Sequence, residues 1–165
     1  MKFDFIVLGA TGMQGRIVVR DLLETGYSVF LCGWEKTGDK KIVSHFLNMY
    51  KKKTNFRYVE ARKISTIINA VRESKSNVLV NCMEGDWNYE VFKACTMLGV
   101  NCIDLGSEIP VTRKQFSLNP IMKKKNIVGI TGIGSVPGIG NVMLRYASEK
   151  FDTIEEINLG FAWDS

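Results

Sequence analysis

The feature that most constrains the fold is a glycine loop between the first apolar segment and the first helical pattern. Residues 3–8 form a short apolar run, which is typical of a buried strand. Residues 12–25 have helical periodicity, which predicts that Ile17, Val18 and Leu22 face inward, and the helix stops at Gly26. The loop itself consists of Gly9, Ala10, Thr11, Gly12, Met13, Gln14 and Gly15. A strand that turns through three glycines into a helix is the setting of a dinucleotide-binding loop.

Each glycine of this loop has a separate task in such a motif. Gly9 permits the tight turn, Gly12 lets the backbone approach a pyrophosphate, and Gly15 lets the helix pack closely on the strand. Ala10 stands where the usual spacing places the first of these glycines. The unpaired amides at the helix N-terminus attract phosphate. The loop therefore predicts an NAD or NADP site, the alternative being a strand–helix turn without a ligand.

Strand and helix patterns alternate along the rest of the chain, which predicts one doubly wound α/β domain of the Rossmann type with a parallel sheet. We expect this domain to span residues 1–150, with residues 151–165 forming the last strand and leading into a further domain. Further strands are predicted at 28–32, 56–59, 78–82, 102–105, 127–130 and 154–161. Further helices are predicted at 40–52, 64–74, 88–98 and 138–150, and from about 112 with a break at Pro120. Asp86 or Asn88 is expected to cap the helix at 88–98, which Gly99 ends.

Size and composition favour a globular protein. The chain has 165 residues, of which 45% are hydrophobic, so it can bury one core. No apolar run is long enough to span a membrane, and the apolar run at the N-terminus ends in glycine, unlike a signal peptide. We therefore expect a cytoplasmic protein. The net charge is +5, but the lysine runs at 51–53 and 123–125 fall at helix ends and lack interleaved aromatic residues, which argues against a nucleic-acid partner.

The four cysteines predict buried free thiols and no metal site. They stand at positions 32, 82, 95 and 102, so no two have the Cys-x-x-Cys spacing, and His45 is the single histidine. Cys32 and Cys82 fall inside apolar strand patterns, where a free thiol behaves as a small apolar side chain.

The choice between NAD and NADP depends on the end of the second strand. A carboxylate there binds the ribose 2′-hydroxyl, and its replacement together with nearby cations admits a 2′-phosphate. The acidic position falls on Gly33, and Trp34 follows as a candidate for stacking on adenine. Lys36, Lys40 and Lys41 are candidates for contacting a phosphate, whereas Glu35 argues against one. These residues favour NADP slightly over NAD.

The chain resembles the nicotinamide-binding N-terminal domain of the saccharopine dehydrogenase family over about residues 3–160. The likeness lies in four segments: the glycine loop at 9–15, the run at 78–82, the stretch at 94–105 and the turn at 132–141. The resemblance implies that Asn81 and Cys82 lie near the cofactor's ribose and that Asp104 borders the nicotinamide pocket. The alternative for Asp104 is an acidic strand end that caps the next turn.

The resemblance also implies a second domain that carries the substrate site and allows a homodimer, so we expect this sequence to be part of a longer protein. The intact protein would be an oxidoreductase that transfers hydride to or from a carbon–nitrogen bond of an amino acid or polyamine precursor, with a small-molecule substrate. One departure is the loop after the strand at 78–82, where the family often has proline and this chain has Glu84 and Asp86. Two carboxylates that point at an anionic cofactor would disfavour its binding. No catalytic residue is identified.

Two other functions remain open. Tyr146 and Lys150 have the Tyr-x-x-x-Lys spacing of short-chain reductases, with Ser135 upstream. However, Tyr146 shares a helical face with Ile139, Val142 and Met143, so we expect it to pack against the sheet. A non-enzymatic redox sensor that binds the dinucleotide is the second alternative, because the fold supplies only the binding.

Overall fold

The computed structural model describes residues 1–34, 39–51 and 53–160 and shows a six-stranded parallel sheet in the order β3-β2-β1-β4-β5-β6. The strands are β1 (Phe5–Leu8), β2 (Val29–Gly33), β3 (Thr54–Tyr58), β4 (Val78–Asn81), β5 (Asn101–Asp104) and β6 (Gly129–Ile130). The helices are α1 (Met13–Glu24), α2 (Asp39–Met49), α3 (Ile64–Ser74), the short 3₁₀ helix η1 (Gly85–Trp87), α4 (Asn88–Leu98), α5 (Ile109–Phe116), α6 (Asn119–Lys124) and α7 (Ile139–Ser148). The expected doubly wound α/β fold is confirmed.

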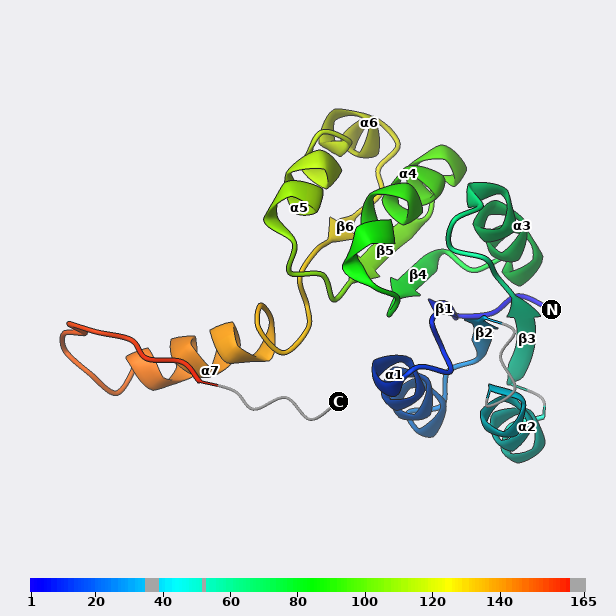
Figure 1. Cartoon of the computed structure of the whole chain (residues 1–165), viewed down its shortest axis with the longest axis horizontal. Coiled ribbons are helices and arrows are strands. Elements are labelled where there is room, and N and C mark those ends of the chain that lie inside the picture. The colour runs from blue at the N-terminus through cyan, green and yellow to red at the C-terminus, as the bar shows by residue number, and fades with distance from the viewer. Residues whose placement is uncertain (35–38, 52, 161–165) are drawn as a thin grey trace.

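Helices cover both faces of the sheet, with α1 and α2 on one side and α3 to α6 on the other (Figure 1). The central strands bury their side chains in both directions because successive residues of a strand point to opposite faces. On β1, Ile6 and Leu8 join the core under α3 and α4, whereas Val7 joins the core under α1 and α2. This double burial explains why β1 and β2 read as continuous apolar runs.

Helix α1 packs through Gly15, Val19 and Leu23, which lie one turn apart along a single face. It ends before Gly26, whose φ of +108° is a backbone conformation that glycine adopts readily. Ile17, which the periodicity predicted to face inward, is 54% exposed. The close approach of the helix at Gly15 fixes the buried face and turns Ile17 away from it.

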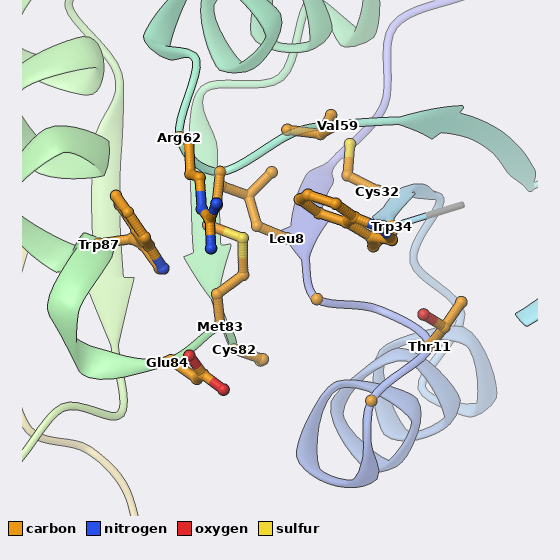
Figure 2. A pocket seen from close by; sticks show the side chains of 14 residues that line it. Leu8, Thr11, Cys32, Trp34, Val59, Arg62, Cys82, Met83, Glu84 and Trp87 are labelled. Carbon is orange, nitrogen blue, oxygen red and sulfur yellow. The ribbon is translucent and has the colours of Figure 1, made fainter. Parts of the chain in front are cut away.

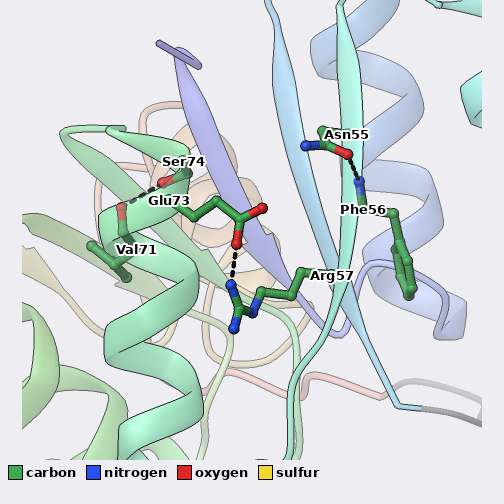
Figure 3. Close-up of polar contacts among 6 residues, drawn as sticks. All are labelled: Asn55, Phe56, Arg57, Val71, Glu73 and Ser74. Carbon is green, nitrogen blue, oxygen red and sulfur yellow. Dashed lines mark hydrogen bonds and ion pairs between the residues drawn. The ribbon is translucent and has the colours of Figure 1, made fainter. Parts of the chain in front are cut away.

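Helix α3 is joined to the outer strand β3 by an ion pair between Arg57 and Glu73 (Figure 3). At the same end of the helix, the Ser74 hydroxyl donates a hydrogen bond to the Val71 carbonyl oxygen at 2.8 Å. The ion pair holds α3 beside β3, whereas the Ser74 bond lies within the helix. The connection between them, residues 59–63, follows the end of β3 and so lies at the carboxyl edge of the sheet.

The last third of the chain departs from the prediction. The helix is broken into α5 and α6, as expected, and Pro120 lies in the first turn of α6. Residues 154–160, the described part of the strand predicted at 154–161, form no strand. None of the described strands lies beside them, and their side chains are exposed. Helix α7 stands away from the sheet (Figure 1). No described helix combines the length and the apolar character that a membrane span requires.

Candidate functional site

A cleft of about 510 Å³ opens at the carboxyl ends of β1, β2, β3 and β4 (Figure 2). Strand β1 pairs with β2 on one side and with β4 on the other, so the strand order reverses at this point. In open α/β sheets, ligands bind in the crevice at such a reversal. The cleft is lined by Leu8, Gly9, Thr11, Gly12, Cys32, Gly33, Trp34, Val59, Ala61, Arg62, Cys82, Met83, Glu84 and Trp87.

Two glycines of the loop are required by close packing of the backbone. Gly9 has a φ of +70°, and a Cβ atom there would lie 2.9 Å from the carbonyl carbon of Cys82. A Cβ atom on Gly15 would overlap the carbonyl oxygen of Gly9 and lie 2.9 Å from the Cα atom of Ala10. The tight turn and the close helix packing that the motif predicts are therefore both present.

The amides at the start of α1 have no helical acceptors. Gly12 is the N-cap and supplies no capping side chain, and the N–H of Arg16 donates the first bond of the helix, to the Gly12 carbonyl oxygen at 3.0 Å. The N–H groups of residues 13–15 come before that bond and so point out of the helix end. Together with the positive end of the helix dipole, they form an anion site that suits a pyrophosphate.

Ala10 supports the loop from inside, because its side chain is fully buried and its N–H donates to the Cys32 carbonyl oxygen at 2.9 Å. Met13 and Gln14 are exposed on the first turn of α1. Of the seven loop residues, the cleft is lined by three, Gly9, Thr11 and Gly12.

The end of β2 carries no carboxylate, because Gly33 has no side chain. A Cβ atom on Gly33 would lie 2.9 Å from Oγ1 and 3.2 Å from Cγ2 of Thr11, so a larger residue there would require the Thr11 side chain to move. Trp34 follows at the cleft wall and is 45% exposed. Glu35 and Lys36 lie outside the described residues. Lys41 lines a separate groove between α1 and α2, and Lys40 is exposed on α2.

Asn81 and Cys82, at the end of β4, have different positions. Cys82 lines the cleft, and burial raises the pKa of its thiol to about 12. Asn81 is fully buried; its Nδ2 donates to Asn88 Oδ1 at 2.7 Å, and its Oδ1 accepts from the Met83 N–H at 3.2 Å. Asn81 therefore positions the loop that follows β4. The prediction that Asn88 or Asp86 caps α4 is wrong: Trp87 is the N-cap residue and α4 has no side-chain cap, because the Asn88 side chain faces Asn81.

Asp104, at the end of β5, is fully buried and binds backbone and side-chain donors. Its Oδ1 accepts the N–H groups of Gly106 and Gly132, both at 2.9 Å. Its Oδ2 accepts from Gln115 Nε2 at 2.6 Å. The carboxylate thus caps the turn after β5 and ties it to the segment after β6, which is the alternative that the sequence left open for this residue.

Several cleft residues were not predicted from the sequence. Except for Leu8 on β1 and Cys32 on β2, they follow the carboxyl ends of β3 and β4, where the crevice of a parallel sheet forms, so their positions relative to these strands are the signal that could have identified them. Glu84 lines the cleft and Asp86 does not, so the carboxylate of this loop that disfavours an anionic cofactor is Glu84. The unpredicted residues are Leu8, Cys32, Val59, Ala61, Arg62, Met83 and Trp87.

The short-chain reductase arrangement is not assembled at this cleft. Tyr146 is 68% exposed on α7, with Lys150 Nζ 5.4 Å from the centre of its ring. The expectation that Tyr146 packs against the sheet is therefore wrong, because α7 leaves the sheet after β6 (Figure 1). Neither of these residues nor Ser135 lines the cleft.

The described cysteines are all free thiols, as expected. Cys32, Cys95 and Cys102 are buried, and Cys82 is half-buried. Burial raises the pKa of the Cys32 thiol, which disfavours the reactive thiolate. Within the described ranges, no three His, Cys, Asp or Glu side chains gather closely enough to hold a metal ion.

Comparisons with known proteins identify relatives of this chain. The profile of the family described as "Saccharopine dehydrogenase NADP binding domain" matches residues 5–130. Carboxynorspermidine synthase from Vibrio cholerae is 23% identical over 164 residues, which cover 93% of this chain and 39% of that protein. The chain thus spans about two fifths of that curated relative.

Solved structures show the same fold. Saccharopine dehydrogenase (L-Glu forming) from Saccharomyces cerevisiae superposes with a TM-score of 0.70 at 15% identity. The superposition covers 90% of this chain and 31% of the yeast chain. The complex of leucoanthocyanidin reductase with NADPH from Vitis vinifera has a TM-score of 0.56 at 15% identity. The superposition covers 76% of this chain and 48% of the reductase chain. With the family match over residues 5–130, the chain belongs to the saccharopine dehydrogenase NADP-binding domain family.

Proposed function

We propose that this chain binds NADP(H) in the cleft between β1 and β4 and is the cofactor-binding part of an oxidoreductase. The observation that carries the proposal is the set of amides at residues 13–15 that have no helical acceptor, in a loop whose turn and helix pack backbone against backbone at Gly9 and Gly15. These amides would hold the pyrophosphate. The match to a family of NADP-binding domains supports the same assignment.

The strand order gives the cofactor a direction. The mononucleotide half built from β1, β2 and β3 takes the adenosine of a dinucleotide, and the other half takes the nicotinamide. Trp34 and Arg62 line the first half of the cleft, and Cys82 and Glu84 line the part that follows β4. Asp104 then shapes the next part of the carboxyl edge through its bonds to Gly106 and Gly132.

We further propose that the intact protein transfers hydride to or from a carbon–nitrogen bond of an amino acid or polyamine precursor. The bound cofactor would supply the hydride chemistry, while this chain binds and orients it. The likeness to carboxynorspermidine synthase supports a polyamine precursor. Hydride transfer also needs a substrate held against the nicotinamide, so this chain on its own would bind the cofactor and turn over nothing.

Titration of the chain with NADPH, followed by tryptophan emission, tests this proposal. Trp34 and Trp87 line the cleft from opposite walls (Figure 2), so a bound dinucleotide should quench their emission in a saturable way. Trp87→Phe should reduce the signal change more than it reduces the affinity measured by calorimetry. Absence of saturable binding at millimolar NADPH would contradict the proposal, and equal affinity for NADH would remove the preference for NADP.

A further inference from the structure

Arg62 brings a positive charge into the cleft. It lies four residues beyond the end of β3, and its side chain extends between Trp34 and Trp87 (Figure 2). The other charged side chain among the described lining residues is Glu84, which follows β4. Arg62 is therefore the positive charge of the described cleft, and it comes from the connection after β3.

Arg62 lacks a counterion among the residues that the structure describes. Its neighbour Lys63 pairs with Glu60, with Nζ 2.7 Å from Oε2, and Arg57 on the preceding strand pairs with Glu73. No carboxylate oxygen of the described residues lies within 4.0 Å of the Arg62 guanidinium. A cation left unpaired in a concave, partly apolar site attracts an anionic ligand.

The neighbouring end of β2 complements this charge. Gly33 has no side chain, so the position that carries an acid in NAD-binding domains has no carboxylate here. NADP differs from NAD by a phosphate on the 2′-oxygen of the adenosine ribose. An arginine guanidinium binds such a phosphate through paired N–H groups, and a nearby arginine is a known way to accommodate it.

The lysines that follow β2 are less well placed within the described structure. Lys41 lines the groove between α1 and α2, together with Arg16 and Arg20, and this groove shares no lining residue with the cleft. Lys40 is exposed on α2 and lines neither. The cation that the described cleft offers to the adenosine end is thus Arg62, from the β3–α3 connection.

We propose that Arg62 binds the 2′-phosphate of NADP and gives this cleft its preference for NADPH over NADH. The inference rests on the proposed function, because it requires that the cleft takes a nicotinamide dinucleotide with its adenosine beside β2 and β3. It makes the β3–α3 connection a determinant of cofactor choice.

The test compares Arg62→Met with Lys63→Met in binding titrations against NADPH and NADH. Both changes remove one exposed positive charge from adjacent positions, but Lys63 is paired with Glu60 and does not line the cleft. Arg62→Met should weaken NADPH binding by about ten- to a hundredfold, the range of a charge-assisted hydrogen bond, and change NADH binding by less than about twofold. Lys63→Met should leave both affinities unchanged. Arg62→Lys should retain part of the preference, since an ammonium keeps the charge without the paired geometry.

The other outcomes overturn the inference. Equal weakening of NADPH and NADH binding by Arg62→Met would show that Arg62 stacks on the adenine, and unchanged NADPH binding would show that another cation binds the phosphate. A wild-type chain that binds neither dinucleotide would overturn the proposed function together with this inference. Because Arg62 is exposed, the variants should fold as the wild type does. Equal melting temperatures would confirm this and would exclude misfolding as the cause of weaker NADPH binding.

Discussion

The backbone of Gly15 lies against the backbone of Gly9 so closely that a single methyl group between them would overlap the Gly9 carbonyl. This contact sets α1 directly on the end of β1 and aims the first turn of the helix into the cleft between β1 and β4. The site is therefore a consequence of how one strand and one helix pack, and not of any reactive side chain.

Gly15→Ala is expected to destabilise the fold. The added Cβ atom would lie 2.7 Å from the carbonyl carbon of Gly9, and neither backbone segment can yield without moving the helix. Overpacking of this kind costs about 1–3 kcal/mol, which lowers the melting temperature of a chain of this size by roughly 2–12 °C. Differential scanning calorimetry measures the shift; an unchanged melting temperature would show that α1 is not held by this contact.

Asp104 is expected to be essential for stability through its hydrogen bonds. Asp104→Ala would leave the N–H groups of Gly106 and Gly132 and the amide of Gln115 without their acceptor, at a cost of about 3 kcal/mol or more. Asp104→Asn should cost less, because its Oδ1 can still accept both backbone N–H groups. The Gln115 amide could then turn to offer its Oε1, which is buried and unpartnered, to the new NH₂ group.

Urea denaturation of both Asp104 variants checks this expectation. The free energy of unfolding should fall in the order wild type, Asp104→Asn, Asp104→Ala. If the two variants lose equal stability, the negative charge itself would be what matters, and the hydrogen-bond account of Asp104 would be wrong.

Cys32 is expected to make the protein less stable at alkaline pH. Burial raises the pKa of its thiol above the ordinary value of 9.0, so the folded chain keeps the proton while the unfolded chain loses it. Because the unfolded state then binds fewer protons, stability falls as the pH rises above 9. Between pH 8 and pH 10, this effect amounts to about 1.4 kcal/mol for one thiol.

Cys32→Ala should therefore lose less stability than the wild type between pH 8 and pH 10, even if it is less stable at pH 8. Val29→Ala is the matched control, because Val29 is also fully buried on β2 and has no titratable group. Chemical denaturation at the two pH values measures the difference. Parallel pH profiles for all three proteins would refute the role of the thiol.

The fold could be predicted from the sequence because its signals are local. The glycine loop, the apolar strands and the stop at Gly99, which adopts a φ of +72°, each act within a few residues. The exceptions depend on distant contacts. The apolar residues at 154–160 suggested a strand, but a strand forms only beside a partner, and the described part of the sheet ends at β6.

The site could be predicted only in part, for the same reason. The loop residues and Trp34 follow the first two strands, where the motif itself indicates their place. Arg62 and Trp87 come to the cleft from connections after β3 and β4; their positions after strand ends indicate the edge of the crevice, but no motif indicates which side chains line it. Asp104 and Asn81 are polar residues at strand ends, which suggests ligand contacts, yet both bind their own backbone or neighbouring side chains.

The measurement that tests the central claim most directly is NADPH binding to Gly12→Ala, with Gly160→Ala as the control. Gly12 lines the cleft with a φ of −71°, and an added Cβ atom there would lie 3.3 Å from the Gly9 carbonyl oxygen, a tight contact that a shift of a few tenths of an ångström relieves; the melting temperature of the variant checks that it folds. The same methyl group would hold the pyrophosphate away from the amides at residues 13–15, and the loss of one or two charge-assisted bonds predicts at least about tenfold weaker binding. A Cβ atom on Gly160 meets nothing within 4 Å, so that variant should bind as the wild type does. Wild-type affinity in a folded Gly12→Ala would contradict the claim that these amides hold the diphosphate.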